Sequence, residues 1–186
     1  MKKILIGALV GGIVLFGWQY AAWRFLDIHK LEQDPVLANE AAVATALKGT
    51  LRGVYAIPGL TQAERKAQGE AYKAWEQKHE AGPVVWINYD PDGKRAMDGK
   101  TLGIGAGLCI GIALVVSMML RGASIRSYLG RVLFVTGFGL FLALAMDAQN
   151  WLWMNEPLDW TKAWIIDHVA GMAATGIILG LIVKPE

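Results

Sequence analysis

Cysteine is almost missing from this 186-residue chain, in which Cys109 is the only one. A single cysteine cannot form a disulfide within the chain or supply the paired thiolates of a zinc or redox motif. Cys109 also lies within an apolar run, which favours a role as a small packing residue. We therefore expect no disulfide, no metal and no cofactor.

The sequence also lacks the short motifs of common enzyme classes. It contains no HExxH, no GxSxG and no P-loop. The GIGAG stretch at 103–107 lacks the spacing of a dinucleotide-binding loop and lies inside an apolar run, not after a strand. The net charge is only +2, and no nucleic-acid-binding motif is present. We expect no nucleic-acid partner, and the sequence favours a non-enzymatic protein.

Charged residues are scarce and unevenly distributed. They make up 18% of the chain against 54% hydrophobic residues, which is more apolar than a typical soluble domain. Residues 24–100 hold 11 Lys or Arg and 11 Asp or Glu, whereas the other 109 residues hold 7 and 5. This distribution predicts a membrane protein with one polar insert, divided into residues 1–23, 24–100 and 101–186.

Four apolar runs are long enough to cross a bilayer as helices, because a hydrocarbon layer of about 30 Å needs about 20 residues. They cover residues 4–23, 102–120, 132–149 and 164–183. The first looks like a signal peptide, but its length and Tyr20 at the potential cleavage site favour an uncleaved anchor. The predicted fold is an all-α membrane protein with four transmembrane helices and a small α/β insert between the first two.

Basic residues near the ends of the runs predict the orientation, because they favour the cytoplasmic side. With four spans, the basic clusters before the first run and between the second and third fall on one side. These clusters are Lys2 and Lys3, and Arg121, Arg126 and Arg131. We expect a bacterial inner-membrane protein with cytoplasmic termini and residues 24–100 in the periplasm.

The insert shows the order helix, strand, helix, strand. The helices are predicted at 39–49 and 61–82, and the strands at 53–59 and 83–89. Thr61 and Glu64 have the spacing of a capping box. Strands separated by about 20 helical residues favour parallel pairing, although antiparallel pairing stays open. A segment with only two strands buries little core, so we expect it to pack on another surface.

Glycines recur at four-residue intervals in three of the four runs, and this spacing puts them on one face of a helix. Small residues on one face let helix backbones approach closely in lipid. The pattern predicts close packing within the bundle, or a flat face for a membrane-protein partner or a second copy. The glycines are Gly7 and Gly11, Gly103, Gly107 and Gly111, and Gly176 and Gly180.

Asp147 is a carboxylate near the end of the third run, about 24 Å beyond Arg131 at ~1.5 Å per helical residue. A carboxylate facing lipid is expensive and needs a partner. His168 lies at a similar depth if the third and fourth runs are antiparallel. We predict a hydrogen bond between Asp147 and His168 near the outer interface. The neighbours that could complete a polar cluster are Asp167, Asp159 and Gln149.

Three interpretations of this pair stay open. It can be a structural clamp between two helices, or a proton or cation relay, because Asp and His are the usual relay residues at membrane depth. A metal or catalytic site that includes Asp167 is disfavoured, because adjacent residues on a helix point about 100° apart. His29 and His79 show no ligand spacing and are expected in solvent.

Tryptophans gather around the same end of the third and fourth runs. Amphipathic rings favour the lipid–water boundary, so they predict an aromatic belt made of Trp151, Trp153, Trp160 and Trp164. The expected function is that of an accessory or scaffolding subunit in a larger membrane complex. The alternatives are a small carrier or proton-linked transport component using Asp147 and His168, and a membrane enzyme acting at the outer leaflet.

Overall fold

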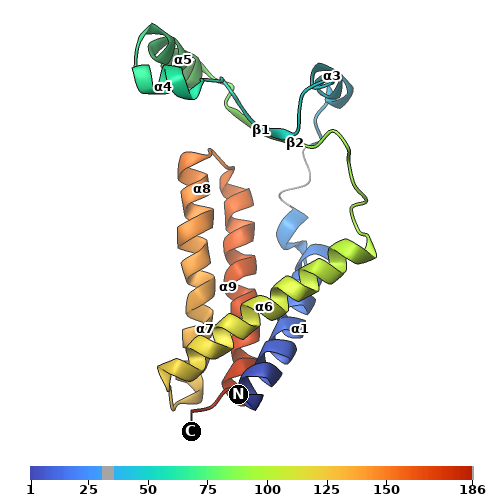
Figure 1. The fold of residues 1–186 in the computed structure, drawn as a ribbon, viewed down its shortest axis with the longest axis vertical. Helices are drawn as coiled ribbons and strands as arrows, with labels where there is room; N and C mark the ends of the chain where they lie inside the picture. Colours follow the sequence, from blue (N-terminus) through green and yellow to red (C-terminus); the bar gives the residue numbers. More distant parts are fainter. Residues whose placement is uncertain (31–35, 186) are drawn as a thin grey trace. The chain divides into compact units, whose positions relative to one another are not determined.

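The computed structural model describes residues 1–30 and 36–185, which fall into two compact units (Figure 1). The helical unit consists of the described residues of Met1–Pro35 and Ala96–Glu186. The insert unit is Val36–Arg95.

Four long helical stretches make up most of the helical unit. Three are the unbroken helices α1 (Lys2–Arg24), α6 (Gly99–Ala123) and α9 (Leu158–Ile182). The other stretch joins α7 (Tyr128–Leu142), the π-helical segment η2 (Ala143–Asp147) and α8 (Ala148–Trp153). All four are long and apolar enough to cross a membrane. The prediction of four helices of this length and composition is therefore confirmed.

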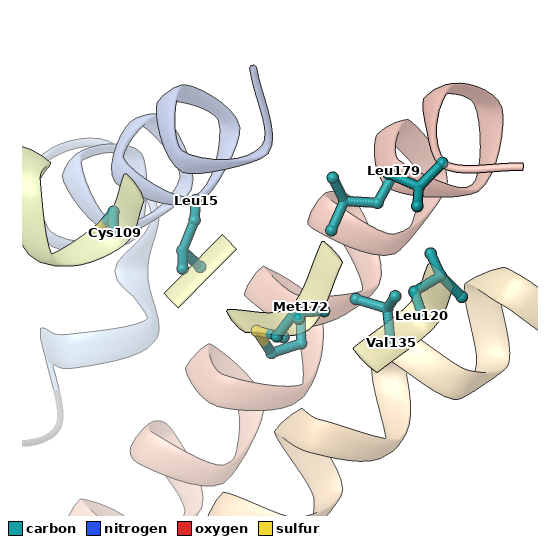
Figure 2. Packing of buried hydrophobic residues seen from close by; sticks show 8 residues of the cluster. Leu15, Cys109, Leu120, Val135, Met172 and Leu179 are labelled. Atoms are coloured by element: carbon teal, nitrogen blue, oxygen red, sulfur yellow. The ribbon is translucent and has the colours of Figure 1, made fainter. Parts of the chain in front are cut away.

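The four stretches pack in a chain of neighbours. α7 lies along α9, and α1 packs on both α9 and α6, whereas α6 and α7 barely touch. In Figure 1, α6 crosses α1 obliquely. The apolar core lies between these helices (Figure 2) and includes Cys109, as its apolar context predicts. Its members are Leu15, Cys109, Val116, Leu120, Val135, Met172, Leu179 and Val183.

The closest backbone approaches involve two glycines that lie outside the predicted repeats. A Cβ atom added to Gly12 would lie 2.5 Å from Ile110 Cα, so α1 and α6 meet there backbone to backbone. A Cβ added to Gly139 would lie 2.5 Å from the His168 carbonyl oxygen, which brings α7 equally close to α9. These positions set the two tightest helix contacts because only a hydrogen fits there.

The predicted glycine repeats have different surroundings. A Cβ on any of the predicted repeat glycines of α1 and α9 would come within 3.3 Å of a side chain or backbone atom of another segment; these are Gly7, Gly11, Gly176 and Gly180. A Cβ on Gly103, Gly107 or Gly111 would meet no atom of the described residues within 4 Å. The prediction that α6 uses this face for packing within the chain is therefore wrong. α6 instead buries a face that includes Cys109, Ala113, Val116 and Leu120.

Arginines hold the end of α9 near the chain termini. The buried Arg131 side chain donates from Nε to the Gly180 carbonyl at 2.8 Å and from Nη1 to the carbonyls of Ile125 and Arg126. Arg121 donates to the Lys184 carbonyl. Both chain ends lie at this end of the helical unit, beside the α6–α7 connection (Figure 1).

The insert unit contains three short helices and two strands. They are α3 (Glu40–Ala46), β1 (Gly53–Ile57), α4 (Gln62–Ala67), α5 (Glu70–Ala81) and β2 (Val85–Tyr89). The single helix predicted at 61–82 is therefore two helices. Gln68 ends α4 in a left-handed conformation with φ of 48°, and Gly69 caps α5.

The two strands pair antiparallel, with Gly53 opposite Tyr89 and Ile57 opposite Val85. The favoured parallel pairing is therefore wrong. A parallel crossover must carry the chain along the full strand length, whereas α4 and α5 leave and return at the same end of the ribbon.

The predicted capping box is confirmed at the start of α4. Thr61 Oγ1 accepts from the Glu64 backbone N–H at 3.2 Å, and Glu64 Oε2 accepts from the Thr61 N–H at 2.9 Å. The Thr61 hydrogen bonds hold the pKa of the Glu64 carboxyl below its ordinary value.

Candidate functional site

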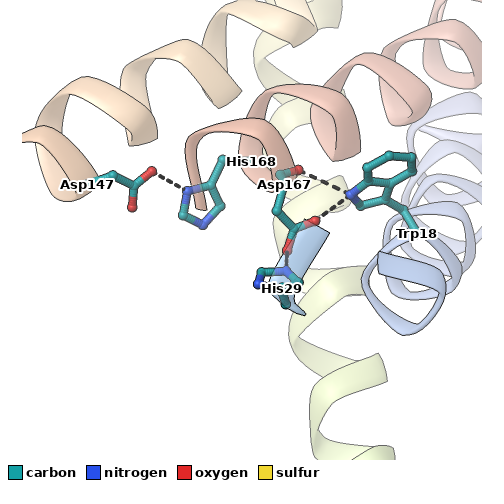
Figure 3. Close-up of polar contacts among 5 residues, drawn as sticks. All are labelled: Trp18, His29, Asp147, Asp167 and His168. Carbon is teal, nitrogen blue, oxygen red and sulfur yellow. Dashed lines mark hydrogen bonds and ion pairs between the residues drawn. The ribbon is translucent and has the colours of Figure 1, made fainter. Parts of the chain in front are cut away.

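Asp167 and His168 are adjacent polar residues within the otherwise apolar middle of α9. Successive residues of a helix point about 100° apart, so the two side chains meet different neighbours. Figure 3 shows His168 turned toward Asp147 and Asp167 turned toward Trp18 and His29. Two adjacent positions on α9 therefore each contribute to a separate carboxylate–imidazole pair.

The first pair is the predicted contact between Asp147 and His168. His168 Nδ1 lies 2.8 Å from Asp147 Oδ2, and the two side chains are 22% and 8% exposed. Asp147 ends η2, where the wider π-helical turn changes the direction of the following side chains. Gly139 brings the α7 backbone against that of α9 beside His168. The predicted hydrogen bond is therefore present.

The second pair joins Asp167 to the end of α1 and to the short helix η1 (Asp27–His29). The Trp18 Nε1–H donates to Asp167 Oδ1 at 2.5 Å and approaches the Asp167 backbone carbonyl at 3.2 Å. His29 Nε2 lies 3.3 Å from Asp167 Oδ2 (Figure 3). Asp167 therefore does not join Asp147, and it ties α9 to the segment that leaves α1.

His29 is buried, with a side chain that is 3% exposed, so the expectation that it lies in solvent is wrong. Its ring stacks on Trp23 at a centroid distance of 4.1 Å and an angle of 7°, and it meets Trp164 edge to face at 5.4 Å. The sequence did contain a signal for this contact. The fourth run holds two ionisable residues and the third run only Asp147, so Asp167 needed a partner from elsewhere.

Two members of the predicted polar cluster lie outside the site. Asp159 is exposed and pairs with Lys162 at 3.1 Å. Gln149 accepts a hydrogen bond from the exposed Trp153 at 3.0 Å. Both contacts link residues three or four positions apart on their own helix, so neither connects helices.

The four tryptophans of the predicted belt have two kinds of surroundings. Trp151 and Trp153 are 48% and 68% exposed. Trp160 and Trp164 are half-buried and lie 6.2 Å apart. Trp164 is part of the site, because its ring contacts both His29 and His168, the latter at 5.5 Å.

A small cavity of about 100 Å³ opens beside the site. Residues from α1, α6, α7 and α9 line it, and three of them are polar: Gln19, Asp167 and His168. Its apolar or aromatic lining consists of Leu15, Trp18, Ile112, Leu142 and Met172. The Gln19 side chain also contacts Cys109, whose Sγ lies 3.1 Å from Gln19 Oε1.

This arrangement has the chemistry of proton binding and exchange. Carboxylates and imidazoles can each bind and release a proton, and both are common in membrane relays. Among residues 1–30 and 36–185, no group of three or more His, Cys, Asp or Glu side chains could hold a metal ion together. No protein-family model, curated protein or solved structure matches this chain, so its function is inferred from its own geometry.

Proposed function

We propose that this chain is a multi-pass integral membrane protein that serves as a non-enzymatic accessory or scaffolding subunit of a larger membrane complex. We place it in a bacterial inner membrane, with both termini in the cytoplasm and the insert in the periplasm. Four long apolar helices support membrane insertion. The basic residues near the chain termini and in the α6–α7 connection support the orientation.

The observation that carries the accessory role is the exposure of the insert unit. No residue between 36 and 95 is buried. Val54 and Trp86 lie on the same face of the β1–β2 ribbon and are 66% and 48% exposed. A two-stranded ribbon is marginal alone, and exposed apolar residues on it mark a surface that another protein can cover.

The helical unit offers a second surface of the same kind. The face of α6 that carries Gly103, Gly107 and Gly111 meets no described residue of the chain. α6 packs mainly on α1, so much of its circumference is open. A helix of a partner, or of a second copy, could approach this flat face closely.

Site-specific crosslinking tests the accessory role. A photoreactive amino acid at Trp86 should give a defined product with a partner or with a second copy in intact membranes. The matched control is Gln77, which is exposed on α5 of the same unit and should give none. The partner should also purify with the chain in fixed stoichiometry in mild detergent. A monomer without a product at position 86 would contradict the proposal.

Thiol labelling tests the orientation. In a Cys109→Ala background, Gln77→Cys should react with a membrane-impermeant reagent in intact cells, whereas Ser124→Cys should react only after lysis. Position 77 lies in the insert and position 124 ends α6. Labelling of position 124 alone in intact cells would reverse the orientation.

A second candidate function is that of a proton-linked transport component. The specific observation in its favour is the presence of two carboxylate–imidazole pairs side by side on α9, next to a cavity that both Asp167 and His168 line. Proteoliposomes containing an internal pH dye test it. Proton uptake driven by a membrane potential should depend on the chain and should disappear in Asp167→Asn. Equal uptake by both proteins would contradict this candidate.

A further inference from the structure

We propose that the two carboxylate–imidazole pairs of α9 form a single proton-binding site, bridged by water in the cavity between Asp167 and His168. This inference extends the second candidate function, proton-linked transport. It rests on that function only for what the protein does with the bound proton. The site itself is defined by burial, charge and the shared cavity, each of which can be tested without a transport assay.

The two carboxylate charges of the site favour proton binding. Asp147 and Asp167 are buried, and in the described part of the chain their ion-pair partners are the imidazoles of His168 and His29. With both imidazoles neutral, two carboxylate charges would be buried in an apolar interior, which is unfavourable. Each proton that an imidazole binds converts its pair into a neutral ion pair. Uptake at one pair therefore changes the charge that the other pair experiences.

The cavity supplies the bridge between the pairs. Its volume of about 100 Å³ has room for water. Asp167, His168 and Gln19 line it, and a buried water needs two to four such polar partners. Because His168 Nδ1 faces Asp147, Nε2 is the ring nitrogen left for water.

The geometry allows a balanced transfer of one proton. A doubly protonated His168 gives the Nε2 proton to a water, which releases a different proton to an oxygen of Asp167 or, through it, to His29. His168 then stays neutral, with its remaining proton on Nδ1 toward Asp147. The second pair gains the charge that the first pair loses, so the total charge of the site is unchanged.

The other ionisable groups on the surrounding elements have separate contacts or lie in solvent. Asp27 and Lys30 pair at 2.7 Å at η1, and Asp159 and Lys162 pair at 3.1 Å on α9. The Cys109 thiol of α6 contacts Gln19, while Tyr20 and Arg24 of α1 are exposed. α8 has no ionisable side chain. Among the described residues, the ionisable groups that contact one another at the site are His29, Asp147, Asp167 and His168.

Nuclear magnetic resonance of the full chain in detergent, with isotope-labelled histidine, tests the coupling. The chain has only 3 histidines, and His79 in the insert unit is an internal reference. Asp167→Asn should shift the titration midpoint of His168, because it removes a neighbouring carboxylate charge. Asp159→Asn, on the same helix but exposed, should leave the midpoint unchanged. An unchanged midpoint in Asp167→Asn would show two independent clamps and overturn the proposal.

A second measurement tests the water bridge and does not depend on the folding of Asp167→Asn. Ile112 lines the cavity but is 43% exposed, so Ile112→Trp can fill the cavity without burying a new side chain in the core. Ile104→Trp, at a 56% exposed position of the same helix, is the control. Magnetisation transfer from water to the His168 ring should be lost only in Ile112→Trp. Its absence in the wild-type protein, or its persistence in Ile112→Trp, would overturn the water bridge.

The outcomes separate this inference from the transport function. Coupled titration and water contact without proton flux in proteoliposomes would retain the site and reject transport. Proton flux with independent titrations would retain transport and reject the single site.

Discussion

The capping box of the insert unit and the carboxylate–imidazole pairs of the helical unit use polar side chains in opposite ways. In the insert, the Thr61–Glu64 capping box joins exposed residues three positions apart. In the helical unit, the pairs join buried or half-buried residues that are 21 positions apart for Asp147 and His168, and 138 apart for His29 and Asp167. The capping box therefore satisfies its polar groups within one helix turn, whereas the two carboxylate–imidazole pairs satisfy theirs between segments far apart in the sequence.

This difference determines how much a substitution lowers the free energy of unfolding. An exposed polar group that loses its partner turns to water, so the loss is small. A buried group that loses its partner keeps its desolvation penalty, which is about 1–3 kcal/mol. We therefore expect large effects in the helical unit and small, local effects in the insert.

The largest effect is expected for Gly139→Leu. The new side chain would collide with the backbone of His168 and Val169, which cannot turn aside as a flexible side chain can. We expect a loss of about 3 kcal/mol in the free energy of unfolding. The measurement is unfolding in mixed detergent micelles, followed by tryptophan fluorescence.

Gly107→Leu is the matched control, because no described atom lies within 4 Å of the added Cβ. It should change the stability of the monomer by less than about 0.5 kcal/mol. The repeat pattern alone predicts the opposite order. Equal losses for both variants would mean that α7 and α9 do not approach as closely as described.

The next prediction tests whether the hydrogen bond of Asp147 or its negative charge stabilises the pair with His168. Asp147→Leu leaves the His168 Nδ1 group without its partner and should cost about 1–3 kcal/mol. Asp147→Asn keeps an acceptor for Nδ1 and should be better tolerated. The same unfolding assay compares the two variants. If Asn costs as much as Leu, the negative charge and not the hydrogen bond stabilises the pair.

The functional readout of the same variants distinguishes a clamp from a relay. An amide cannot carry a proton, so in a relay Asp147→Asn should retain the fold and lose proton uptake. In a clamp, Asp147→Asn should retain every property of the wild-type chain.

The sequence predicts much of the helical unit because two properties follow from residue order alone. These are the composition of each apolar run and the depth of a residue along its helix. The four helices follow from the lengths of the apolar runs. The Asp147–His168 contact follows from matched depth along two antiparallel helices. What the sequence does not contain is the rotation of each helix about its axis, which decides that Gly12 and Gly139 face a neighbour while Gly107 does not.

The burial of His29 and the antiparallel strand pairing were not predicted for a second reason. In both places the chain reverses direction after a helix or strand ends. His29 is buried because η1 folds back against α9 immediately after α1. The strands pair antiparallel because the chain breaks at Gln68 and returns to the same end of the ribbon. Neither the turn after α1 nor the break at Gln68 contains a proline–glycine or asparagine–glycine pair.

A smaller effect is expected in the insert for Thr61→Ala. It removes the side chain that accepts from the Glu64 N–H, which should cost the helix about 1 kcal/mol. Amide hydrogen exchange should accelerate in α4 and stay unchanged in the helical unit. Thr45→Ala is the control, because the Thr45 hydroxyl contacts the Ala41 carbonyl within α3 and caps nothing. Faster exchange throughout the chain would show that the insert is not locally stabilised.

The smallest effect is a dependence of α4 on pH that Glu64→Gln should abolish. The hydrogen bonds from Thr61 lower the pKa of the Glu64 carboxyl in the folded chain, so its ionised form stabilises the cap. This contribution is complete above the pKa of the unfolded chain and is lost as the pH falls through the lowered folded value. Exchange protection of α4, corrected for the intrinsic rate, should therefore fall in acid for the wild-type chain and stay level in Glu64→Gln. Glu76→Gln on α5 lies outside the cap and should behave like the wild type. If Glu64→Gln and the wild type lost protection in parallel, the acid effect would come from another group, and the cap would act through the neutral hydrogen bond of Thr61 alone.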